Sequence, residues 1–358
     1  MEYAKLVEEH GSNVAAAAAI GVSEATIRRR LAKEQANDNF SVVRRSTFRR
    51  GDDDSVIGYW ETECRDEKKA QEAREAALEA LAAKLPRAAP VARPEQSTEQ
   101  ELATVYTLTD AHVGMLAWHR EGGADWDLEI AERTIVGCFA EAIRSAPAAQ
   151  TAIFNQLGDL LHYDSWKPET PTSGHLLDAD GRLPKMVGVA VRILRQVIGL
   201  LLEKHERVHV ILAEGNHDMA SSVWLRVMFA ALYEDEPRVT VDQSDLPYYC
   251  HVHGDTMMVF HHSHLKRAEQ LRGFVAAQFA PEWGQTKKRY IHTGDKHHSF
   301  EKDELGAKVI QHPTLAARDA YAARHGWHSE RYMNAITYHA KFGEVGRVSI
   351  CPEMLPSA

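Results

Sequence analysis

Short apolar runs alternate with longer amphipathic stretches from residue 101 onward, and no other feature of the sequence constrains the fold as strongly. The apolar runs have the length of buried strands, and the amphipathic stretches have the length of helices. Strands are expected at Thr104–Leu108, Thr151–Gln156, Val208–Ala213, Thr256–Phe260, Arg289–His292 and Ala307–Gln311. Helices are expected at 127–145, 185–205 and 221–233. Strands that alternate with helices predict a layered α/β domain, which we place at 101–358.

The beginning of the chain predicts a small all-α module at residues 1–38. Short helices are expected there, the third over residues 24–33, because Gly21 turns the chain just before it. The spacing of Ala17, Gly21 and Ile27 is typical of a helix-turn-helix, in which a small residue lets the helices touch and an apolar residue anchors the last one. A helical bundle that binds protein is the alternative.

Residues 39–100 are predicted to link this module to the α/β domain. Alternating apolar residues on both sides of Gly51–Asp54 predict a β-hairpin between Ser41 and Glu63. Residues 65–85 are rich in Ala, Glu and Lys and predict an acidic helix, and prolines after it complete the linker. The acidic stretch is expected to be solvated, and a coiled-coil arm that makes the protein a homodimer is the alternative.

Basic residues cluster in the N-terminal part of a chain whose formal net charge is −9. Residues 22–50 hold eight Lys and Arg residues against three acidic ones. Such a cluster attracts the phosphate backbone of nucleic acids. We therefore expect this part to bind DNA, through Thr26, Arg28, Arg29, Arg30, Arg44 and Arg45.

Histidine is the unusual residue of the composition. The chain has 20 histidines, and His10 is the one that lies in the first hundred residues. Histidine is the commonest metal ligand, so the later part of the chain is expected to carry the chemistry. No apolar run is long enough for a membrane span, and the first residues are too acidic for a signal peptide, so we expect a cytoplasmic protein without a membrane partner. The four scattered cysteines argue against a disulfide framework or a thiolate zinc site.

Polar side chains that can bind metal follow five of the expected strands. In open α/β sheets, ligands bind at the carboxyl ends of the strands, so these side chains are expected to meet in one place. They are Asp110 and His112, Asp159 and His162, Asn216 and His217, His261, His262 and His264, and Asp295, His297 and His298.

The order of these motifs, DxH, GD, GNHD, H and GxxH, resembles the calcineurin-like metallophosphoesterases over roughly residues 101–350. The GDLLH and GNHD motifs are most similar to SbcD-type DNA repair nucleases. The attached helix-turn-helix and the segment DAYAARHGWHSERYMNAITYHAKFGEVGR look more like phage-encoded relatives. The resemblance implies a metallophosphoesterase β-sandwich flanked by helices, in the cytoplasm of a bacterial host if the protein is phage-encoded.

The resemblance also implies two divalent metals and a ligand set for each. Asp110, His112 and His297 would hold the first metal, Asp159 would bridge both, and Asn216 and His262 would hold the second. Two cations close together clamp the oxygens of a phosphoester and make a bridging hydroxide available near neutral pH. Mixed nitrogen and oxygen ligands favour manganese, with iron or zinc as alternatives.

Three further residues receive roles in catalysis. By resemblance, His217 would protonate the leaving group or stabilise charge on the phosphate, and His162 would place the scissile phosphate. Asp218 is expected either to orient His217 or to cap the helix that follows.

Two positions depart from the family pattern. Asp295 stands where the family usually has a histidine, so it either ligates the second metal, which would favour manganese, or marks a lost ligand. The family pattern H-G is His262-Ser263 here, which leaves His261 and His264 as competing ligands. We expect His262 to be the ligand.

Other residues have two interpretations. Trp166, in the long polar loop 165–185, either stacks on a base or fixes the loop to the core. Four residues near the C-terminal end either contact phosphate or lie on a solvated helix face, namely Arg318, His325, His328 and Arg331. His205 and His209 are expected on the surface.

Together these features predict a metal-dependent phosphodiesterase that acts on duplex or single-stranded DNA as a nuclease. An ATPase partner is typical of the repair nucleases that it resembles. A phosphatase or phosphodiesterase for small or protein substrates is the first alternative. A DNA-binding regulator with a degenerate metal site is the second.

Overall fold

The computed structural model describes most of the chain after residue 95 and parts of what precedes it. The described residues are 7, 9–10, 12–23, 26–27, 40–49, 56–65, 88, 91–94, 96–171 and 173–356. The chain divides into two compact units, Met1–Lys84 and Leu85–Ala358. The second unit includes the expected α/β domain, 101–358, and Ala88 N also donates a hydrogen bond within this unit, to Leu232 O.

In the first unit the structure describes one helix and one hairpin. Helix α2 (Asn13–Ala19) begins after Ser12, whose side chain accepts a hydrogen bond from Ala15 N. Strands β1 (Phe40–Arg49) and β2 (Val56–Arg65) pair antiparallel, which confirms the predicted hairpin.

Several predictions for this unit fall wholly or partly outside the described residues. Of the expected third helix, 24–33, the structure describes Thr26 and Ile27, which are helical, and Arg28, Arg29 and Arg30 lie outside. Arg44 and Arg45 lie on β1, and the acidic helix expected at 65–85 is not among the described residues. The helix-turn-helix and its DNA contacts stay predictions.

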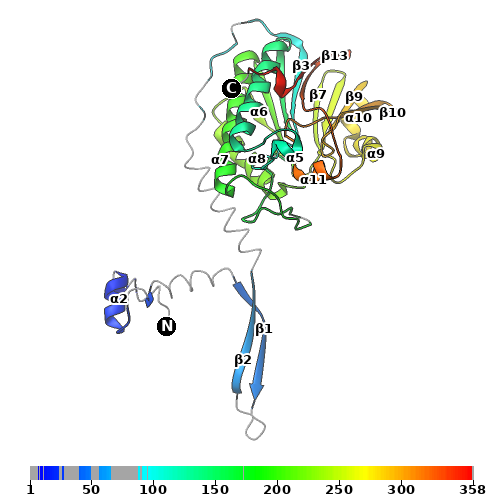
Figure 1. The fold of residues 1–358 in the computed structure, drawn as a ribbon. Helices are drawn as coiled ribbons and strands as arrows, with labels where there is room; N and C mark the ends of the chain where they lie inside the picture. The colour runs from blue at the N-terminus through cyan, green and yellow to red at the C-terminus, as the bar shows by residue number, and fades with distance from the viewer. Residues whose placement is uncertain are drawn as a thin grey trace. The chain divides into compact units, whose positions relative to one another are not determined.

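A six-stranded sheet forms the centre of the second unit, in the order β13-β12-β3-β4-β5-β6 (Figure 1). Strands β3 to β6 run parallel, and β12 is antiparallel to both β3 and β13. The bounds are β3 Glu99–Leu108, β4 Ala149–Gln156, β5 Arg207–Leu212, β6 Val239–Val241, β12 Met333–His339 and β13 Gly343–Ile350.

Three long helices cover the outer face of this sheet, at α6 (Leu128–Ser145), α7 (Leu183–Lys204) and α8 (Met219–Leu232). Each contributes apolar residues to one continuous core with the sheet. Helix α6 is capped by Asp127, whose side chain accepts from Ile130 N. The predicted helices are confirmed at close to the predicted bounds.

A five-stranded sheet lies against the other face, in the order β10-β11-β9-β8-β7. A second apolar core joins the two sheets and includes Val105, Ile153 and Phe260. Helices α9 (Ala268–Gln278) and α10 (Ala280–Gln285) cover the outside of this sheet through a third core. Its strands are β7 Tyr249–His253, β8 Thr256–Phe260, β9 Lys288–Thr293, β10 Phe300–Glu304 and β11 Ala307–Gln311.

The layers are thus helices, sheet, sheet and helices, so the predicted α/β sandwich flanked by helices is confirmed. Two short helices, α5 (His119–Gly122) and α11 (Ala320–Arg324), lie in loops that follow strand ends. A single 3₁₀ turn, Pro352–Met354, follows β13. Among the described helices, none is long and apolar enough to cross a membrane.

The expectation that His205 lies on the surface is wrong. Its side chain is fully buried at the end of α7, where Nδ1 lies 2.7 Å from Ala149 O and Nε2 lies 3.0 Å from the hydroxyl of Tyr106. Because a carbonyl only accepts, Nδ1 donates there. Burial lowers the pKa of His205 to about 4, so the ring is neutral and serves the core.

Candidate metal centre

The residues predicted to bind metal all lie at strand ends of the two sheets. Asp110 follows β3, Asp159 follows β4 and Asn216 follows β5, so one sheet supplies these three. His262 follows β8 and His297 follows β9 in the other sheet. The site therefore lies where the carboxyl ends of both sheets meet.

The backbone is unusual at these strand ends. Among the described residues, six that are not glycine have φ between 42° and 93°, in the left-handed region that L-residues rarely adopt. They are Asp110, His112, Asp159, Ser263, Asp295 and His297. Such conformations cost about 1–3 kcal/mol each and gather at functional sites. Five of the six are predicted site residues, and the sixth follows His262.

Two glycines allow these loops to approach one another. A Cβ on Gly215 would lie 2.0 Å from Asp159 Oδ1, and a Cβ on Gly158 would lie 2.6 Å from His262 Nδ1. Real Cβ atoms do not come this close to another heavy atom. The GD and GNHD motifs therefore need glycine for contact between loops as well as for the turn.

Asp110, His112 and His297 form one group of potential ligands. Nε2 of His297 lies 3.2 Å from Asp110 Oδ1 and 3.3 Å from Nε2 of His112. Asp110 is fully buried, and its Oδ2 accepts hydrogen bonds from Thr109 Oγ1 at 2.6 Å and from Asp295 N at 3.1 Å. These bonds fix the carboxylate and leave Oδ1 facing the histidines.

Asp110, Asp159 and His262 form a second group. Nε2 of His262 lies 3.3 Å from Asp159 Oδ2 and 3.9 Å from Asp110 Oδ1. Nδ1 of His262 donates to Leu157 O at 2.7 Å, so Nε2 is the nitrogen turned toward the carboxylates. Asp110 belongs to both groups, whereas Asp159, the residue expected to bridge, belongs to the second.

The buried atoms of these groups fit a bound cation. Asp110 Oδ1, His262 Nε2 and Asn216 Oδ1 are buried, and apart from ion-pair contacts none has a hydrogen-bond partner in the described part of the chain. Buried polar atoms are normally satisfied, so two orphaned acceptors and an orphaned imidazole nitrogen at these strand ends call for a ligand. Carboxylate, amide and imidazole atoms are those that bind divalent transition metals.

Electrostatics link the carboxylates to the histidines. Burial alone would raise the pKa of Asp110, but His297 and His262 outweigh it and lower the pKa to about 2. Burial alone would lower the pKa of His262, but Asp159 and Asp110 outweigh it and raise the pKa to about 10. Protons on imidazoles therefore balance the carboxylates, and metal binding would require the release of such protons.

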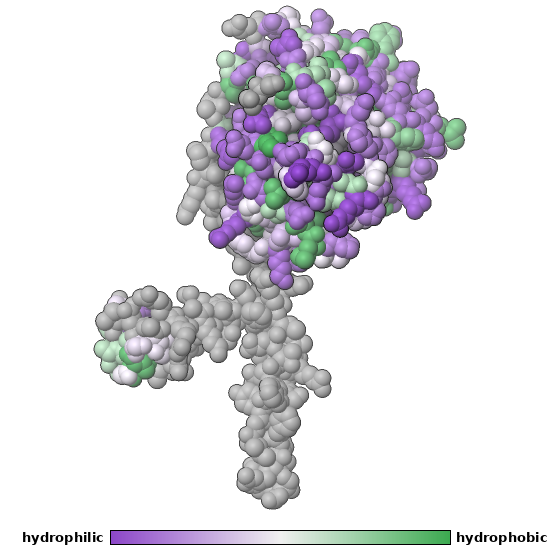
Figure 2. All heavy atoms as spheres, viewed as in Figure 1, coloured by the Kyte–Doolittle hydropathy of each residue, from purple (hydrophilic) through white to green (hydrophobic). Residues whose placement is uncertain are grey.

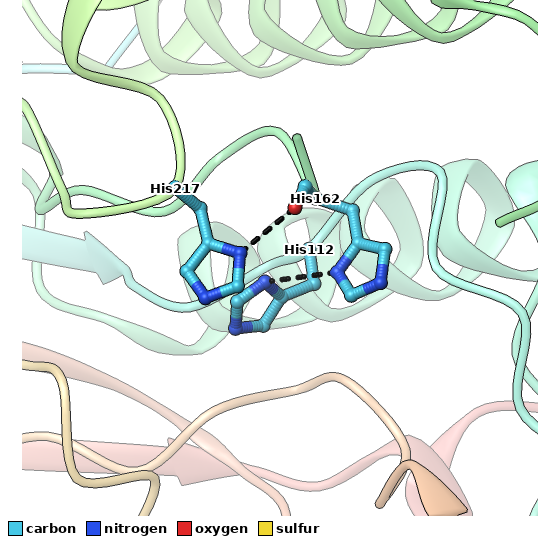
Figure 3. Close-up of side chains that lie close together, drawn as sticks. All are labelled: His112, His162 and His217. Atoms are coloured by element: carbon cyan, nitrogen blue, oxygen red, sulfur yellow. Dashed lines mark hydrogen bonds between the residues drawn. The ribbon is translucent and has the colours of Figure 1, made fainter. Parts of the chain in front are cut away.

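His112, His162 and His217 form a third group, drawn in Figure 3. Nδ1 of His162 lies 3.4 Å from Nδ1 of His112, and Nδ1 of His217 donates to His162 O at 2.8 Å. Because Nδ1 of His217 carries that proton, its Nε2 is left for a substrate or a water. Burial, and next the charge of His217, lower the pKa of His162 to about 3, so its ring is neutral.

Asp295 is placed differently from the other predicted ligands. Its Oδ2 lies 2.6 Å from Lys296 Nζ, and it joins none of the three groups among the described residues. In the neighbouring motif, Nδ1 of His261 donates to Pro247 O, and His264 Nε2 lies 3.5 Å from Glu214 Oε1. His262 is thus the histidine of that motif that enters a ligand group.

Asp218 makes contacts that neither sequence alternative describes. It precedes α8, but its side chain makes no capping hydrogen bond there. Its Oδ1 accepts from Gly215 N at 2.9 Å and Asp159 N at 3.2 Å, and its Oδ2 accepts from Leu161 N at 3.1 Å. Asp218 therefore joins the GD and GNHD loops.

Asp164 is a residue that the sequence interpretation missed. Its carboxylate accepts hydrogen bonds from the backbone of Ala220 and Ser221 and so caps the beginning of α8. Thr314 was missed as well, and its hydroxyl donates to Asp110 O at 2.6 Å. Neither has a local sequence signal, because both contact residues that are distant along the chain.

Replacing Asp218 with asparagine is expected to lower the free energy of unfolding by about 1–3 kcal/mol. The amide would turn an NH₂ group toward either Leu161 N or the Gly215 loop, and a buried donor would face another donor. Urea denaturation followed by fluorescence measures the change. The exposed Asp235 offers the control Asp235→Asn, and equal midpoints for the two variants would contradict this account of Asp218.

The fold and the site together define a two-sheet α/β protein with a candidate metal centre at the strand ends. No family model matches the sequence, and no curated protein matches it. Similar solved structures include a conserved protein from Streptococcus pneumoniae TIGR4 that is described as a predicted phosphoesterase. It has 10% identity and a TM-score of 0.32, and the match covers 71% of this chain and 92% of that chain.

Two more structures are similar at the same level. Yfce, a phosphoesterase from E. coli, has 10% identity and a TM-score of 0.33 and covers 68% of this chain and 98% of its own. An archaeal phosphodiesterase has 11% identity and a TM-score of 0.35 and covers 69% of this chain and 99% of its own. The function is therefore argued from the site and not from these likenesses.

Proposed function

We propose that this protein is a metal-dependent phosphodiesterase of the calcineurin-like type and that its substrate is DNA. One observation carries the proposal. Two groups of ligand atoms share the buried Asp110, and a third group of histidines adjoins them through His112. Adjacent sites for two divalent cations, beside histidines that hold and transfer protons, suit the hydrolysis of a phosphoester.

The ligand assignment follows the geometry and the motif order. Asp110, His112 and His297 would hold one cation, Asn216 and His262 would hold the other, and Asp159 would be shared, as the resemblance implies. Asp110 belongs to both ligand groups and would lie beside both cations. When bound, the cations would polarise the phosphoryl oxygens and lower the pKa of water at the site. The nitrogen and oxygen donors favour manganese, with iron or zinc as alternatives.

The histidines beside the ligands would handle the proton and the phosphate. The proton on Nδ1 of His217 is held by His162 O. This contact orients the ring so that Nε2 can donate to the leaving oxygen or to a phosphoryl oxygen. His162 is neutral and lies against both His112 and His217, where it would place the phosphate by hydrogen bonding.

The choice of DNA rests on the basic cluster of the first unit. Residues 22–50 would attract a polyanion and raise its concentration near the second unit. A nuclease of phage type in the bacterial cytoplasm, with an ATPase partner, is the finer form of this proposal. A phosphatase or phosphodiesterase for small or protein substrates is the second candidate, because the site geometry alone suits any accessible phosphoester.

Full-length protein with manganese is expected to cleave DNA, and Asp159→Asn is expected to lose at least about 100-fold in rate, because a ligand carboxylate is removed. Linear duplex, supercoiled and single-stranded DNA would be compared on gels. The second unit has its own core, so the fragment 85–358 can be assayed by itself. Comparing its rate of DNA cleavage with that of the whole chain tests whether the first unit delivers DNA to the site. Undiminished cleavage by Asp159→Asn would overturn the site.

Chromogenic substrates separate the two candidate functions. A phosphodiesterase that acts on DNA should hydrolyse bis(4-nitrophenyl) phosphate faster than 4-nitrophenyl phosphate. The reverse preference, together with no cleavage of DNA, would favour the phosphatase.

A further inference from the structure

Exposed aromatic side chains concentrate on the loops beside the candidate metal centre. Among the described residues of the second unit, six aromatic residues of the Phe, Trp and Tyr types are exposed, and five follow strands whose ends border the site. They are Trp118 after β3 (50% exposed), Trp166 after β4 (69%), Phe300 after the GDKHH motif (40%), and Tyr321 (62%) and Trp327 (58%) after β11. The sixth, Phe342, lies in the turn between β12 and β13.

Hydrogen bonds hold these loops to one another and to the site. Thr314 Oγ1, at the start of the loop that carries Tyr321 and Trp327, donates to Asp110 O. Farther along that loop, Arg318 Nε donates to Gly122 O at 3.3 Å, next to the loop of Trp118. The loop after β4 pairs with the loop after β3 through Leu116 N and Asp178 O at 3.0 Å. These contacts hold the loops that carry Trp118, Trp166, Tyr321 and Trp327 together next to Asp110, and Phe300 lies on β10, which pairs with β11. We call the five exposed rings the aromatic rim.

Several of the exposed rings lie close to other rings or to cations. Tyr321, His325 and Trp327 form a cluster, with ring centroids 4.3 Å apart for Tyr321 and His325 and 5.0 Å for His325 and Trp327. The guanidinium of Arg120 lies 5.2 Å above the ring of Trp118. Figure 2 shows that hydrophilic residues cover most of the visible face of the second unit, with hydrophobic residues scattered among them.

The same region also contains a tryptophan with a structural role, and the contrast is informative. Trp126 is completely buried, and the guanidinium of Arg331 lies 5.4 Å from its ring centroid. Trp118 and Trp327, in contrast, keep half or more of their surface in contact with solvent. The exposed tryptophans therefore offer flat apolar faces to solvent, which suits a ligand that itself presents flat apolar faces.

We propose that this aromatic rim, Trp118, Trp166, Phe300, Tyr321 and Trp327, stacks on unpaired bases, so that the substrate strand is single-stranded on either side of the phosphate to be cut. The proposal rests on the proposed function and specifies its substrate. Bases within a duplex stack on one another and have no face to offer an aromatic side chain, whereas every unpaired base does. The neighbouring Arg120, Arg318 and Arg324 supply charge that is complementary to the phosphates.

The double variant Tyr321→Ala/Trp327→Ala tests the aromatic rim, with Phe342→Ala as the matched control. Binding is measured by fluorescence anisotropy of a labelled oligothymidylate of about 15 nucleotides, in chelator so that nothing is cleaved. An excess of unlabelled duplex occupies the basic first unit. The double variant is expected to bind at least about 5-fold more weakly, and Phe342→Ala is expected to bind as the unmodified chain does.

Hydrolysis of bis(4-nitrophenyl) phosphate is the second measurement, and it separates the two proposals. This small substrate has no flanking nucleotides to bind along the rim, so the double variant should hydrolyse it normally while its KM for the oligonucleotide rises. If the double variant kept its affinity for the oligonucleotide, or lost as much affinity for duplex DNA as for the oligonucleotide, the stacking proposal would be overturned. The proposed phosphodiesterase function would not be affected. Weaker binding by a protein that hydrolyses neither substrate would support the aromatic rim and overturn the proposed function. If the double variant bound the oligonucleotide normally but no longer bound a protein partner, the aromatic rim would be a protein-contact surface. The base-stacking proposal would then be overturned.

Discussion

Asp110→Asn is expected to abolish metal binding at both ligand groups and to lower phosphodiester hydrolysis by about 1,000-fold or more. Asp110 belongs to both groups, and its Oδ1 faces His262 and His297 without a hydrogen bond. An amide in its place removes the negative charge that both groups share. Catalysis through metal ions is worth several kcal/mol, and each 1.36 kcal/mol is a factor of ten in rate.

The asparagine variant should remain folded, which makes the result interpretable. Its amide oxygen can still accept the hydrogen bonds that Thr109 Oγ1 and Asp295 N donate to Oδ2 of Asp110. Manganese titration by calorimetry measures the loss, and Asp303→Asn, on the exposed strand β10, is the control. Manganese affinity close to that of the unmodified chain would refute the central role of Asp110.

Gly215→Ala is expected to destabilise the protein by about 3 kcal/mol and to weaken metal binding as well. The new Cβ would lie 2.0 Å from Asp159 Oδ1 and 2.3 Å from Asp159 N. Because one of these atoms is backbone, the conflict cannot be relieved by a rotamer change, and overpacking of this kind costs about 1–3 kcal/mol or more. The carboxylate of Asp159 would then be displaced from His262.

Gly188→Ala provides a matched control, since the same single carbon is added in the middle of α7. A Cβ there would meet nothing within 4 Å. This variant is expected to be more stable by about 0.5–1 kcal/mol, because alanine is the better helix former. The urea midpoint is therefore expected to fall for Gly215→Ala and to rise for Gly188→Ala. Midpoints that shift in the same direction for both variants would show that the Gly215 contact does not matter.

The sequence predicted the elements that carry strong periodic patterns. Every expected strand and long helix of the α/β domain is present near its expected bounds, because buried parallel strands and amphipathic helices have distinctive hydrophobic patterns. Strands β6, β10, β12 and β13 were missed. In β10 most side chains are exposed, and in β13 they alternate in exposure at the edge of the sheet, so neither forms an apolar run.

The candidate site was predictable in residue type more than in geometry. Motif order identified Asp110, His112, His262 and His297, and the structure brings them together. The contacts of Asp218 and Asp164 could not be predicted, because each joins loops that are far apart in sequence. Asp295 has a positive φ and forms an ion pair with Lys296, and a motif pattern that specifies residue types predicts neither.

The position of β12 has a consequence for how the protein is made. This strand pairs with β3, so the centre of the larger sheet joins residues 102–106 to residues 335–339. During synthesis on the ribosome, β3 emerges long before β12. The edge of β3 that pairs with β12 therefore stays unpaired until nearly the whole chain has been translated. Pairings so distant in sequence form slowly. An incomplete translation product would therefore hold all the ligand residues and still lack the strand that pairs with β3 beside Asp110, so the larger sheet is complete only when synthesis is nearly finished.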